Sequence, residues 1–300
     1  MLLYCIIICG PTAIGKTALA IELASHFFSE IISADSRHCY KELDIGVAKP
    51  TGEQLNNVQH YFINSHSIFD QVTAAGFEQY AMAAAEKIFL KNNVAIMVGG
   101  TGLYIRAFTH GMDEIPPINN ETRKKILALY SDKGINWLLN EIKIQDPVYY
   151  LSGEINNPQR SLRALEVKLS TGKSILDFQS GIIKNRNFQC IKIGLQMNRP
   201  LLYSRINNRV DEMIKQGLED EARALYAYKN LNALQTVGYQ EFFEYFDGKI
   251  SKNRAVELIK QHTRNYAKRQ ITWFKKEPQI QFCNPSAQEI IALLQEQIKY

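Results

Sequence analysis

The stretch Gly10-Pro11-Thr12-Ala13-Ile14-Gly15-Lys16-Thr17 (GPTAIGKT) decides the fold, because it satisfies every fixed position of the phosphate-binding pattern GxxxxGK[ST]. The apolar run of residues 2–9 (LLYCIIIC) precedes it, and residues 18–27 have helical spacing. In a strand–loop–helix of this kind, the backbone N–H groups of residues 12–17 and the positive end of the helix can cradle a phosphate. Lys16 would reach the terminal phosphate oxygens, and the Thr17 hydroxyl would be a ligand for Mg²⁺. The sequence therefore predicts a phosphate-binding loop (P-loop).

The P-loop alone does not say which phosphate compound binds. ATP and GTP are its usual ligands, but a pyrophosphate attached to any other group would be held equally well. The identity of the ligand has to come from the rest of the sequence.

The first hundred residues alternate between strand and helix patterns. Residues 30–33 (EIIS) are expected to form a second, short strand, residues 94–98 are an apolar run, and the alanine-rich residues 77–90 have helical spacing. This alternation predicts an α/β fold with a parallel sheet and helices on both faces.

The pattern changes after residue 112. Residues 113–120 contain two prolines and two asparagines, and residues 121–130, 135–143 and 159–170 are helical in pattern. A strand pattern returns only at residues 190–195 (CIKIGL). We therefore expect a P-loop α/β core of residues 1–112 and 187–300, interrupted by an all-helical insertion of residues 113–186.

A polar segment, Ala34-Asp35-Ser36-Arg37-His38, follows the second predicted strand. The carboxyl ends of parallel strands face the ligand, so Asp35 is expected beside the P-loop. A carboxylate there can hold Mg²⁺ through water, or it can accept a proton from an attacking nucleophile. The segment continues as residues 44–50 (DIGVAKP), which we expect to be a loop.

The third predicted strand ends in residues 98–102 (VGGTG), whose glycines would allow backbone and ligand to approach closely. Thr101 can donate or accept one hydrogen bond at that point. No aspartate ends this strand, although a motor-type P-loop NTPase carries its magnesium-holding acid there. The absence argues against an ATPase.

Basic residues recur at helical spacing. Arg160 and Arg163 share one face of a helix in the insertion, and Arg205 and Arg209 share a face of a later helix. The second pair suits a clamp on phosphate oxygens.

Residues 260–276 (KQHTRNYAKRQITWFKK) hold six basic residues and no acid. A helical projection places Lys260, Arg264, Lys268 and Lys275 in one stripe, with Tyr266, Ala267, Trp273 and Phe274 opposite and Ile271 out of place. A basic face on an aromatic base suits a nucleic-acid backbone.

The composition excludes several classes of protein. Apolar residues make up 46% and charged residues 22%, which is ordinary globular usage, and no apolar run approaches the roughly 20 residues of a bilayer span. We expect neither a membrane span nor a secretory signal. The five cysteines contain no CxxC pair, which favours a reducing cytosol, and a net charge of +5 is a mild indication of a polyanionic partner.

Taken together, the motifs GPTAIGKT, ADSRHCYKELDIGVAKP, VGGTGLY, QRSLRALEV, TVGYQE and TRNYAKRQITWF resemble those of the tRNA dimethylallyltransferases (tRNA isopentenyltransferases), in the order of that family and over residues 10–274. This family transfers the dimethylallyl group of dimethylallyl diphosphate to N6 of the adenosine at tRNA position 37. The resemblance implies a P-loop kinase-like core with a helical insertion. It also explains a P-loop without a following acid, because the loop would bind a diphosphate leaving group. His38 and Val47 depart from the family pattern, in which glutamine and threonine are common.

The resemblance implies a role for each motif. Asp35 would be the base that takes the proton of the adenine amine, and Lys16, Arg209 and Mg²⁺ on Thr17 would stabilise the departing diphosphate, while Thr101 would orient the diphosphate or the amine. The partners would be tRNA and dimethylallyl diphosphate. Apart from the resemblance, the cysteine usage favours a cytoplasmic location, and the lack of a coiled coil or a large exposed apolar stripe in the sequence favours a monomer. The tRNA path would include Asp35, Ser36, Arg37, His38, Thr101, Arg123, Gln159, Arg160, Ser161, Leu162, Arg163, Gln235, Thr236, Val237, Gly238, Tyr239, Gln240 and, within residues 264–270, Arg264, Lys268 and Arg269.

Two other functions are compatible with a P-loop. One is a small-molecule kinase in which ATP donates a phosphate, against which the basic residues 260–276 count. The other is a nucleotide-gated RNA-binding protein without group transfer, which would have no need of Asp35 as a base.

Overall fold

The structure is a computed structural model that describes residues 2–298. The chain divides into two compact units, one made of Met1–Gly111 with Lys184–Tyr300 and the other of Met112–Ile183. These bounds lie within a few residues of the expected core and insertion.

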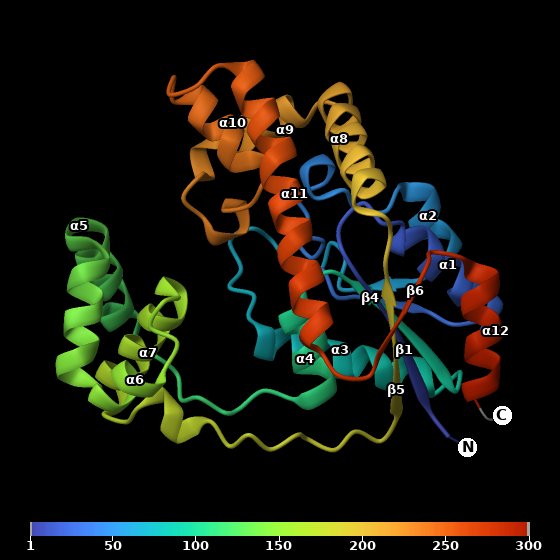
Figure 1. Cartoon of the computed structure of the whole chain (residues 1–300), viewed down its shortest axis with the longest axis horizontal. Helices are drawn as coiled ribbons and strands as arrows, with labels where there is room; N and C mark the ends of the chain where they lie inside the picture. The colour runs from blue at the N-terminus through green and yellow to red at the C-terminus, as the bar shows by residue number, and fades with distance from the viewer. Residues whose placement is uncertain (1, 299–300) are drawn as a thin grey trace. The chain divides into compact units, whose positions relative to one another are not determined.

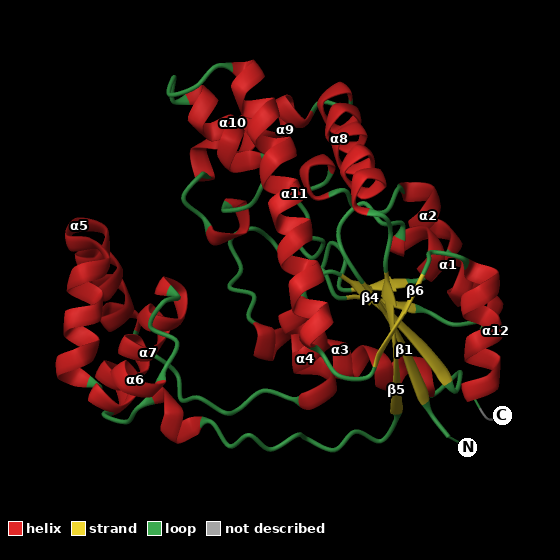
Figure 2. Cartoon of the chain, in the orientation of Figure 1, coloured by secondary structure: helices red, strands yellow, loops and turns green. Residues whose placement is uncertain are grey.

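The first unit is built on a parallel sheet with the strand order β3-β2-β4-β1-β5-β6 (Figure 2). The predicted α/β class is confirmed. β1 (Tyr4–Cys9), β2 (Ile31–Ser33), β4 (Val94–Gly99) and β5 (Gln189–Leu195) match the predicted strands. The edge strands β3 (His60–Tyr61) and β6 (Ile280–Cys283) were not predicted, because one has two residues and the other is largely exposed and lacks an apolar run.

Helices cover both faces of this sheet (Figure 1). Alternate residues of β1 point to opposite faces, as the pleat of a strand requires. Cys5 and Ile7 pack in a cluster with residues of α3 (Ala74–Phe89) and α4 (Gly102–His110). Ile6 and Ile8 pack in a second cluster with α1 (Lys16–His26) and α12 (Ala287–Gln297). The unit also contains α2 (Gly52–Asn57), α8 (Arg199–Lys215), α9 (Leu218–Leu225), α10 (Tyr239–Phe246), α11 (Lys252–Lys276) and the short 3₁₀ helices η1 (Ile45–Val47), η3 (Tyr226–Tyr228) and η4 (Asn232–Leu234).

The helix α11 begins eight residues earlier than the stretch that the sequence singled out, and it packs on two sides. Phe274 belongs to the first core cluster, whereas Ala267 belongs to the second and Ile271 packs against it. The sequence placed Ile271 out of pattern among the basic residues, but α11 packs on two core clusters and Ile271 contacts the second of them.

The second unit contains α5 (Asn120–Gln145), α6 (Pro147–Ser152), α7 (Pro158–Thr171) and the 3₁₀ helix η2 (Ile175–Phe178) around its own core. Gly134, with φ 71° and ψ −166°, interrupts α5, and the two halves correspond to the predicted helices at 121–130 and 135–143. The described residues of this unit include no strand.

None of the described helices has both the length and the apolar composition needed to cross a bilayer.

Candidate active site

Three of the segments that the sequence singled out meet at one edge of the sheet. β2, β4 and β1 are neighbours, and their carboxyl ends lead into residues 34–38, residues 99–102 and the P-loop. Ala34 N–H donates to Val98 O over 2.7 Å, and Thr101 N–H donates to Ala34 O over 3.2 Å. The sheet therefore brings the P-loop, Asp35 and Thr101 into one region.

The P-loop has the backbone of an anion-binding turn. Gly10 (φ 144°), Ala13 (φ 63°) and Gly15 (φ 105°) all have positive φ, which lets successive N–H groups turn toward one centre. α1 has neither a side-chain cap nor an acidic residue in its first turn, so none of its own side chains neutralises its positive end. Lys16 folds back over the loop and donates from Nζ to Pro11 O over 2.8 Å.

Gln270 of α11 fixes the start of the P-loop. It is 5% exposed, and its Oε1 accepts the N–H of Thr12 over 2.9 Å while its Nε2 donates to Gly100 O over 2.9 Å. This corrects three expectations. Thr12 N–H is already paired, and a Cβ at Gly100 would lie 2.1 Å from Gln270 Nε2, so this glycine makes room for Gln270. Gln270 itself is buried and lines the site from inside, whereas residues 264–270 were expected to line the path for RNA.

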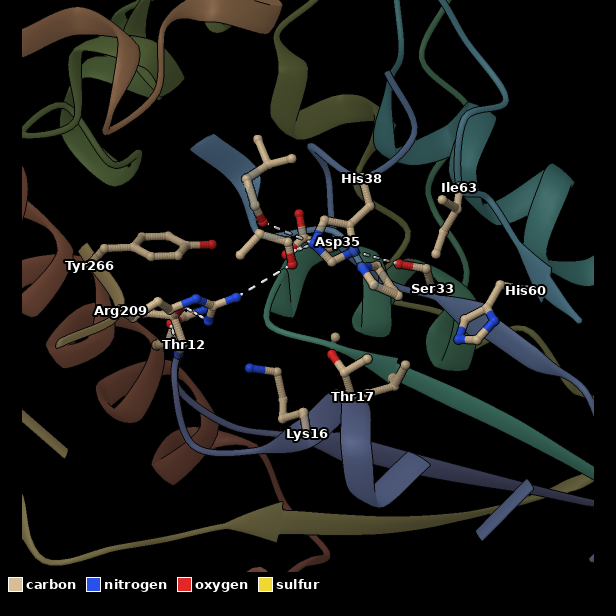
Figure 3. Close-up of a pocket in the computed structure, with 16 residues that line it drawn as sticks. Thr12, Lys16, Thr17, Ser33, Asp35, His38, His60, Ile63, Arg209 and Tyr266 are labelled. Atoms are coloured by element: carbon tan, nitrogen blue, oxygen red, sulfur yellow. Dashed lines mark hydrogen bonds and ion pairs between the residues drawn. The ribbon is translucent and has the colours of Figure 1, made fainter. Parts of the chain in front are cut away.

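A cavity opens above these strand ends (Figure 3). Basic groups of α1 and α8 and the carboxylate that follows β2 all border this one space, and the phenol of Tyr266 points toward Asp35. The cavity can therefore hold an anion against the P-loop and place the attached group beside a carboxylate. Its lining residues are Thr12, Lys16, Thr17, Ser33, Asp35, His38, Val47, Ala48, Pro50, His60, Ile63, Val98, Gly99, Arg209, Tyr266 and Gln270.

The two carboxylate oxygens of Asp35 have different neighbours. Oδ1 accepts the N–H of Arg37 over 2.9 Å, and Oδ2 lies 3.9 Å from His38 Nε2. Burial by itself favours the neutral carboxyl, but the neighbouring His38, the Arg37 N–H donor and the charge of Lys16 outweigh it, so the pKa of Asp35 lies below its ordinary value. Asp35 is thus ionised at neutral pH and can accept a proton at Oδ2.

His38 connects Asp35 to the loop of residues 44–50. Its Nε2 lies 3.1 Å from Val47 O and its Nδ1 lies 3.4 Å from Ser33 Oγ. Burial lowers the pKa of His38, although Asp35 opposes the shift. The ring is therefore neutral at pH 7, with its proton on Nε2, where it can be donated to Val47 O.

Two cations face Asp35 across the cavity. Burial lowers the pKa of Lys16 to about 8, and the Asp35 carboxylate limits that shift. Arg209 of α8 donates from Nη1 to Thr12 Oγ1 over 3.3 Å and from Nη2 to Ala48 O over 3.4 Å. Arg205, one turn earlier, lines an adjoining groove on the outer side of the P-loop. The predicted arginine pair therefore lies at the loop.

Thr101 does not border the cavity among the described lining residues. Its Oγ1 accepts the N–H of Ser36 over 3.1 Å and lies beside the phenol of Tyr266. Thr101 thus holds the segment that carries Asp35. Its expected action on substrate stays a prediction.

The predicted RNA contacts of the first unit divide into exposed and buried groups. Arg37 donates to Asn232 O over 3.0 Å and to Gln235 O over 3.4 Å, which ties residues 232–235 to the cavity. Gln235, Thr236, Val237 and Gln240 are exposed or half-buried. Gly238 is buried and Tyr239 is 0% exposed, so neither can contact RNA, and Tyr239 belongs to the core.

The basic stripe of α11 is shorter than predicted. Lys260 pairs with Asp211 over 2.5 Å, and Arg264 donates to Asn207 over 2.6 Å, so both contact α8. Lys268 and Arg269 are exposed, and Arg269 lies over the ring of Tyr266 at 5.7 Å from its centroid. The basic surface of α11 accordingly lies in its C-terminal half.

In the second unit, the predicted contacts cluster at the start of α7. Ser161 and Leu162 are buried in the core of this unit, which corrects their assignment to an RNA surface. Gln159 and Arg160 are exposed, and Arg160 pairs with Glu154. Arg123 and Arg163 both reach the buried carboxylate of Glu166, at 3.5 and 3.6 Å.

The oxygen atoms of Thr17 and Asp35 beside the P-loop fit a magnesium ion better than a metal that needs several protein ligands. The described residues hold no cluster of three or more His, Cys, Asp or Glu side chains suited to a metal. Thr17 lines the cavity with Asp35, and magnesium usually keeps most of its waters and binds through few protein oxygens and substrate phosphates.

The family model described as IPP transferase matches residues 38–277, which is most of the chain. The chain belongs to this family. The family predicted from the motifs is therefore confirmed.

Curated relatives match along nearly the whole chain. A protein of Christiangramia forsetii named tRNA dimethylallyltransferase is 47% identical over 279 residues, covering 93% of this chain and 92% of the relative. A protein of Bacteroides fragilis named tRNA dimethylallyltransferase 1 is 43% identical and covers 98% of each chain.

Solved structures agree with the fold. The tRNA isopentenylpyrophosphate transferase of Bacillus halodurans has a TM-score of 0.72 and 32% identity, over 98% of this chain and 96% of that one. A eukaryotic dimethylallyltransferase described as acting on tRNA has a TM-score of 0.80 and 26% identity, over 98% of this chain and 79% of that one.

Proposed function

We propose that this chain transfers the dimethylallyl group of dimethylallyl diphosphate to N6 of the adenosine at tRNA position 37, next to the anticodon. The products are N6-dimethylallyladenosine and pyrophosphate. The observation that carries the proposal is the position of Asp35, whose carboxylate borders the same cavity as Lys16 and Arg209. A motor-type P-loop NTPase carries an acid at the end of the strand that corresponds to β4, and glycines stand there instead.

The leaving group is stabilised at the P-loop. As the C1–O bond of the allylic diphosphate breaks, its electron pair leaves with pyrophosphate, and negative charge grows on the bridging oxygen. Lys16, Arg209 and the N-terminus of α1 are already placed around that site, so little reorganisation is needed when the charge develops. A diphosphate beside Lys16 also favours its protonated form, which opposes the effect of burial.

The nucleophile is activated at Asp35. The lone pair of an adenine amine is delocalised into the ring, so the N6–C1 bond forms as a base removes a proton. Asp35 Oδ2 takes that proton, while the Arg37 N–H keeps Oδ1 in place. Thr101 holds Ser36 and with it the strand end that carries the base.

Mg²⁺ would be held by Thr17 and the diphosphate oxygens, and it would supply further neutralisation of the leaving group.

The target base must leave the anticodon-loop stack to reach the cavity, because chemistry on N6 needs access that stacking denies. The exposed Lys268 and Arg269 beside Tyr266, together with Gln235 and Gln240, are the part of the described surface that we assign to tRNA. We further propose that the chain acts in the cytoplasm as a monomer. The five free cysteines fit a reducing compartment.

Parallel assays of the purified protein test this function against its rivals. We expect prenyl incorporation into tRNA that carries adenosine at position 37, and none into the same tRNA with guanosine there. ATP hydrolysis or phosphorylation of a small molecule without prenyl transfer would favour the kinase. RNA binding without any turnover would favour a nucleotide-gated RNA-binding protein.

A further inference from the structure

Residues 44–50, here called the wall loop, form one side of the active cavity. Val47, Ala48 and Pro50 line it, and Asp44, Ile45 and Lys49 border the adjoining groove beside the P-loop. The sequence predicted an irregular loop, but Ile45–Val47 form one 3₁₀ turn, η1.

The backbone of the wall loop is an acceptor for two groups of the site. Ala48 O accepts from Arg209 Nη2 over 3.4 Å, and Val47 O lies 3.1 Å from His38 Nε2. The position of this backbone therefore decides where Arg209 and His38 are held relative to the P-loop and Asp35.

Glu221 of α9, far away in sequence, anchors this loop. Its Oε2 accepts the N–H of Ile45 over 2.8 Å and of Asp44 over 3.2 Å, and its Oε1 accepts the N–H of Gly46 over 3.0 Å. Tyr239 completes the set by donating its hydroxyl to Oε1 over 2.5 Å. Two carboxylate oxygens thus receive four donors, which fills their lone pairs.

The same anchor explains a glycine of the loop and a buried tyrosine. A Cβ at Gly46 would lie 2.6 Å from the ring of Tyr239, so only glycine leaves room for the ring at this point of the loop. Burial, and then the negative charge of Glu221, raise the pKa of Tyr239, so its hydroxyl remains a donor. Tyr239 belongs to this anchor and not to the RNA surface.

We propose that Glu221 is a positioning residue of the transfer reaction, because it holds the wall loop in the place where Ala48 O and Val47 O fix Arg209 and His38. The effect of Glu221 on the transfer reaction rests on the proposed function. Its effect on binding of diphosphate at the P-loop can be measured without turnover.

The variant Glu221→Gln tests this role with almost no change in size. An amide has one acceptor oxygen, and its NH₂ group would face two backbone N–H donors, so the loop must move away from α9. We expect the dissociation constant of Mg²⁺–pyrophosphate and the KM for dimethylallyl diphosphate to rise at least about tenfold, because Arg209 loses its fixed position. The dissociation constant for tRNA should stay within about twofold, and amide hydrogen exchange at residues 44–46 should become faster.

Glu219→Gln is the matched control, since Glu219 lies two residues away on α9 and pairs with Arg223 and Lys252 instead of the wall loop. If Glu221→Gln fails to fold, Tyr239→Phe and Gly46→Ala provide the test. The first removes one donor and the second introduces a clash of a single methyl with the Tyr239 ring.

Unchanged pyrophosphate affinity and unchanged exchange in Glu221→Gln would overturn the proposal. So would equal losses in Glu219→Gln, or a loss of tRNA affinity and melting temperature as large as the loss of diphosphate affinity, since either would make Glu221 a general stabiliser. If wild-type protein transfers no prenyl group and Glu221→Gln still weakens pyrophosphate binding, the proposed function fails and the anchoring role stands.

Discussion

Replacement of Asp35 by asparagine removes its ability to act as a base but keeps the size of the side chain and its hydrogen bond with the Arg37 N–H. The substituted side chain keeps its volume and keeps an oxygen for the Arg37 N–H, which lies 2.9 Å from Asp35 Oδ1 in the wild type. An NH₂ group takes the place of Oδ2, the oxygen that lies 3.9 Å from His38 and is free to accept a proton, and an amide nitrogen cannot accept one. General base catalysis contributes about 10²–10⁴ in rate, so we expect Asp35→Asn to lower kcat at least about 10²-fold, or about 2.7 kcal/mol.

The same substitution should change the pH dependence of diphosphate binding. The Asp35 carboxylate opposes the lowering of the Lys16 pKa by burial, and in its presence that pKa is about 8. Without this charge the pKa of Lys16 falls below its wild-type value of about 8, so more of the lysine is neutral at pH 8 than in the wild type. The KM of Asp35→Asn for dimethylallyl diphosphate should match wild type at pH 6.5 and exceed it at pH 8.

Steady-state assays at both pH values, with product measured as N6-dimethylallyladenosine, give kcat and KM. Filter binding gives the tRNA affinity, which should stay within about threefold of wild type. Asp70→Asn is the control, because Asp70 is an exposed carboxylate in the same unit and does not line the cavity. Near-normal kcat in Asp35→Asn would refute the assignment of the base.

Three further predictions concern the groups around this centre. Lys268→Ala should weaken tRNA binding and reduce the slope of log K against log salt by about one unit, measured by filter binding; an unchanged slope would place Lys268 off the phosphate path. Gln270→Leu should raise the KM for dimethylallyl diphosphate several-fold and lower the melting temperature, because Thr12 N–H and Gly100 O both lose their partner; wild-type values of both in calorimetry and kinetics would contradict the role of Gln270. The pKa of His38 is lowered in the folded chain, so the unfolded chain binds more protons below pH 6.5 and stability falls there. Urea unfolding at pH 7.5 and 5.5 should therefore show a smaller loss of stability in His38→Gln than in wild type, by up to about 1 kcal/mol, and equal losses would exclude His38 as the group responsible.

The parts of the fold that could be predicted are those set by local pattern. A continuous apolar run, a glycine loop and a helix identify β1, the P-loop and α1, and the rule that parallel strand ends face the ligand places Asp35 near Lys16. The prolines and asparagines after residue 112 mark the start of the second unit to within a residue.

The parts that could not be predicted depend on contacts across long sequence separations. Gln270 reaches Thr12 across 258 residues, and Glu221 reaches Ile45 across 176. Periodicity also cannot distinguish a helix face that meets solvent from one that meets another helix, which is why Lys260 and Arg264 were assigned to an RNA surface and in fact contact α8. Tyr239, Ser161 and Leu162 were assigned to the tRNA path from whole family motifs, and those motifs contain buried as well as exposed residues.

The central claim is that the P-loop holds a leaving diphosphate while carbon, and not phosphorus, is transferred. The most direct test uses dimethylallyl diphosphate labelled with ¹⁴C in the allyl group and ³²P in the diphosphate, with unmodified tRNA and Mg²⁺. The account predicts that ¹⁴C appears in N6-dimethylallyladenosine of the digested tRNA and that ³²P is released in equal amount as pyrophosphate. No ¹⁴C in tRNA, with phosphate released from ATP instead, would contradict it and assign the P-loop to a nucleoside triphosphate.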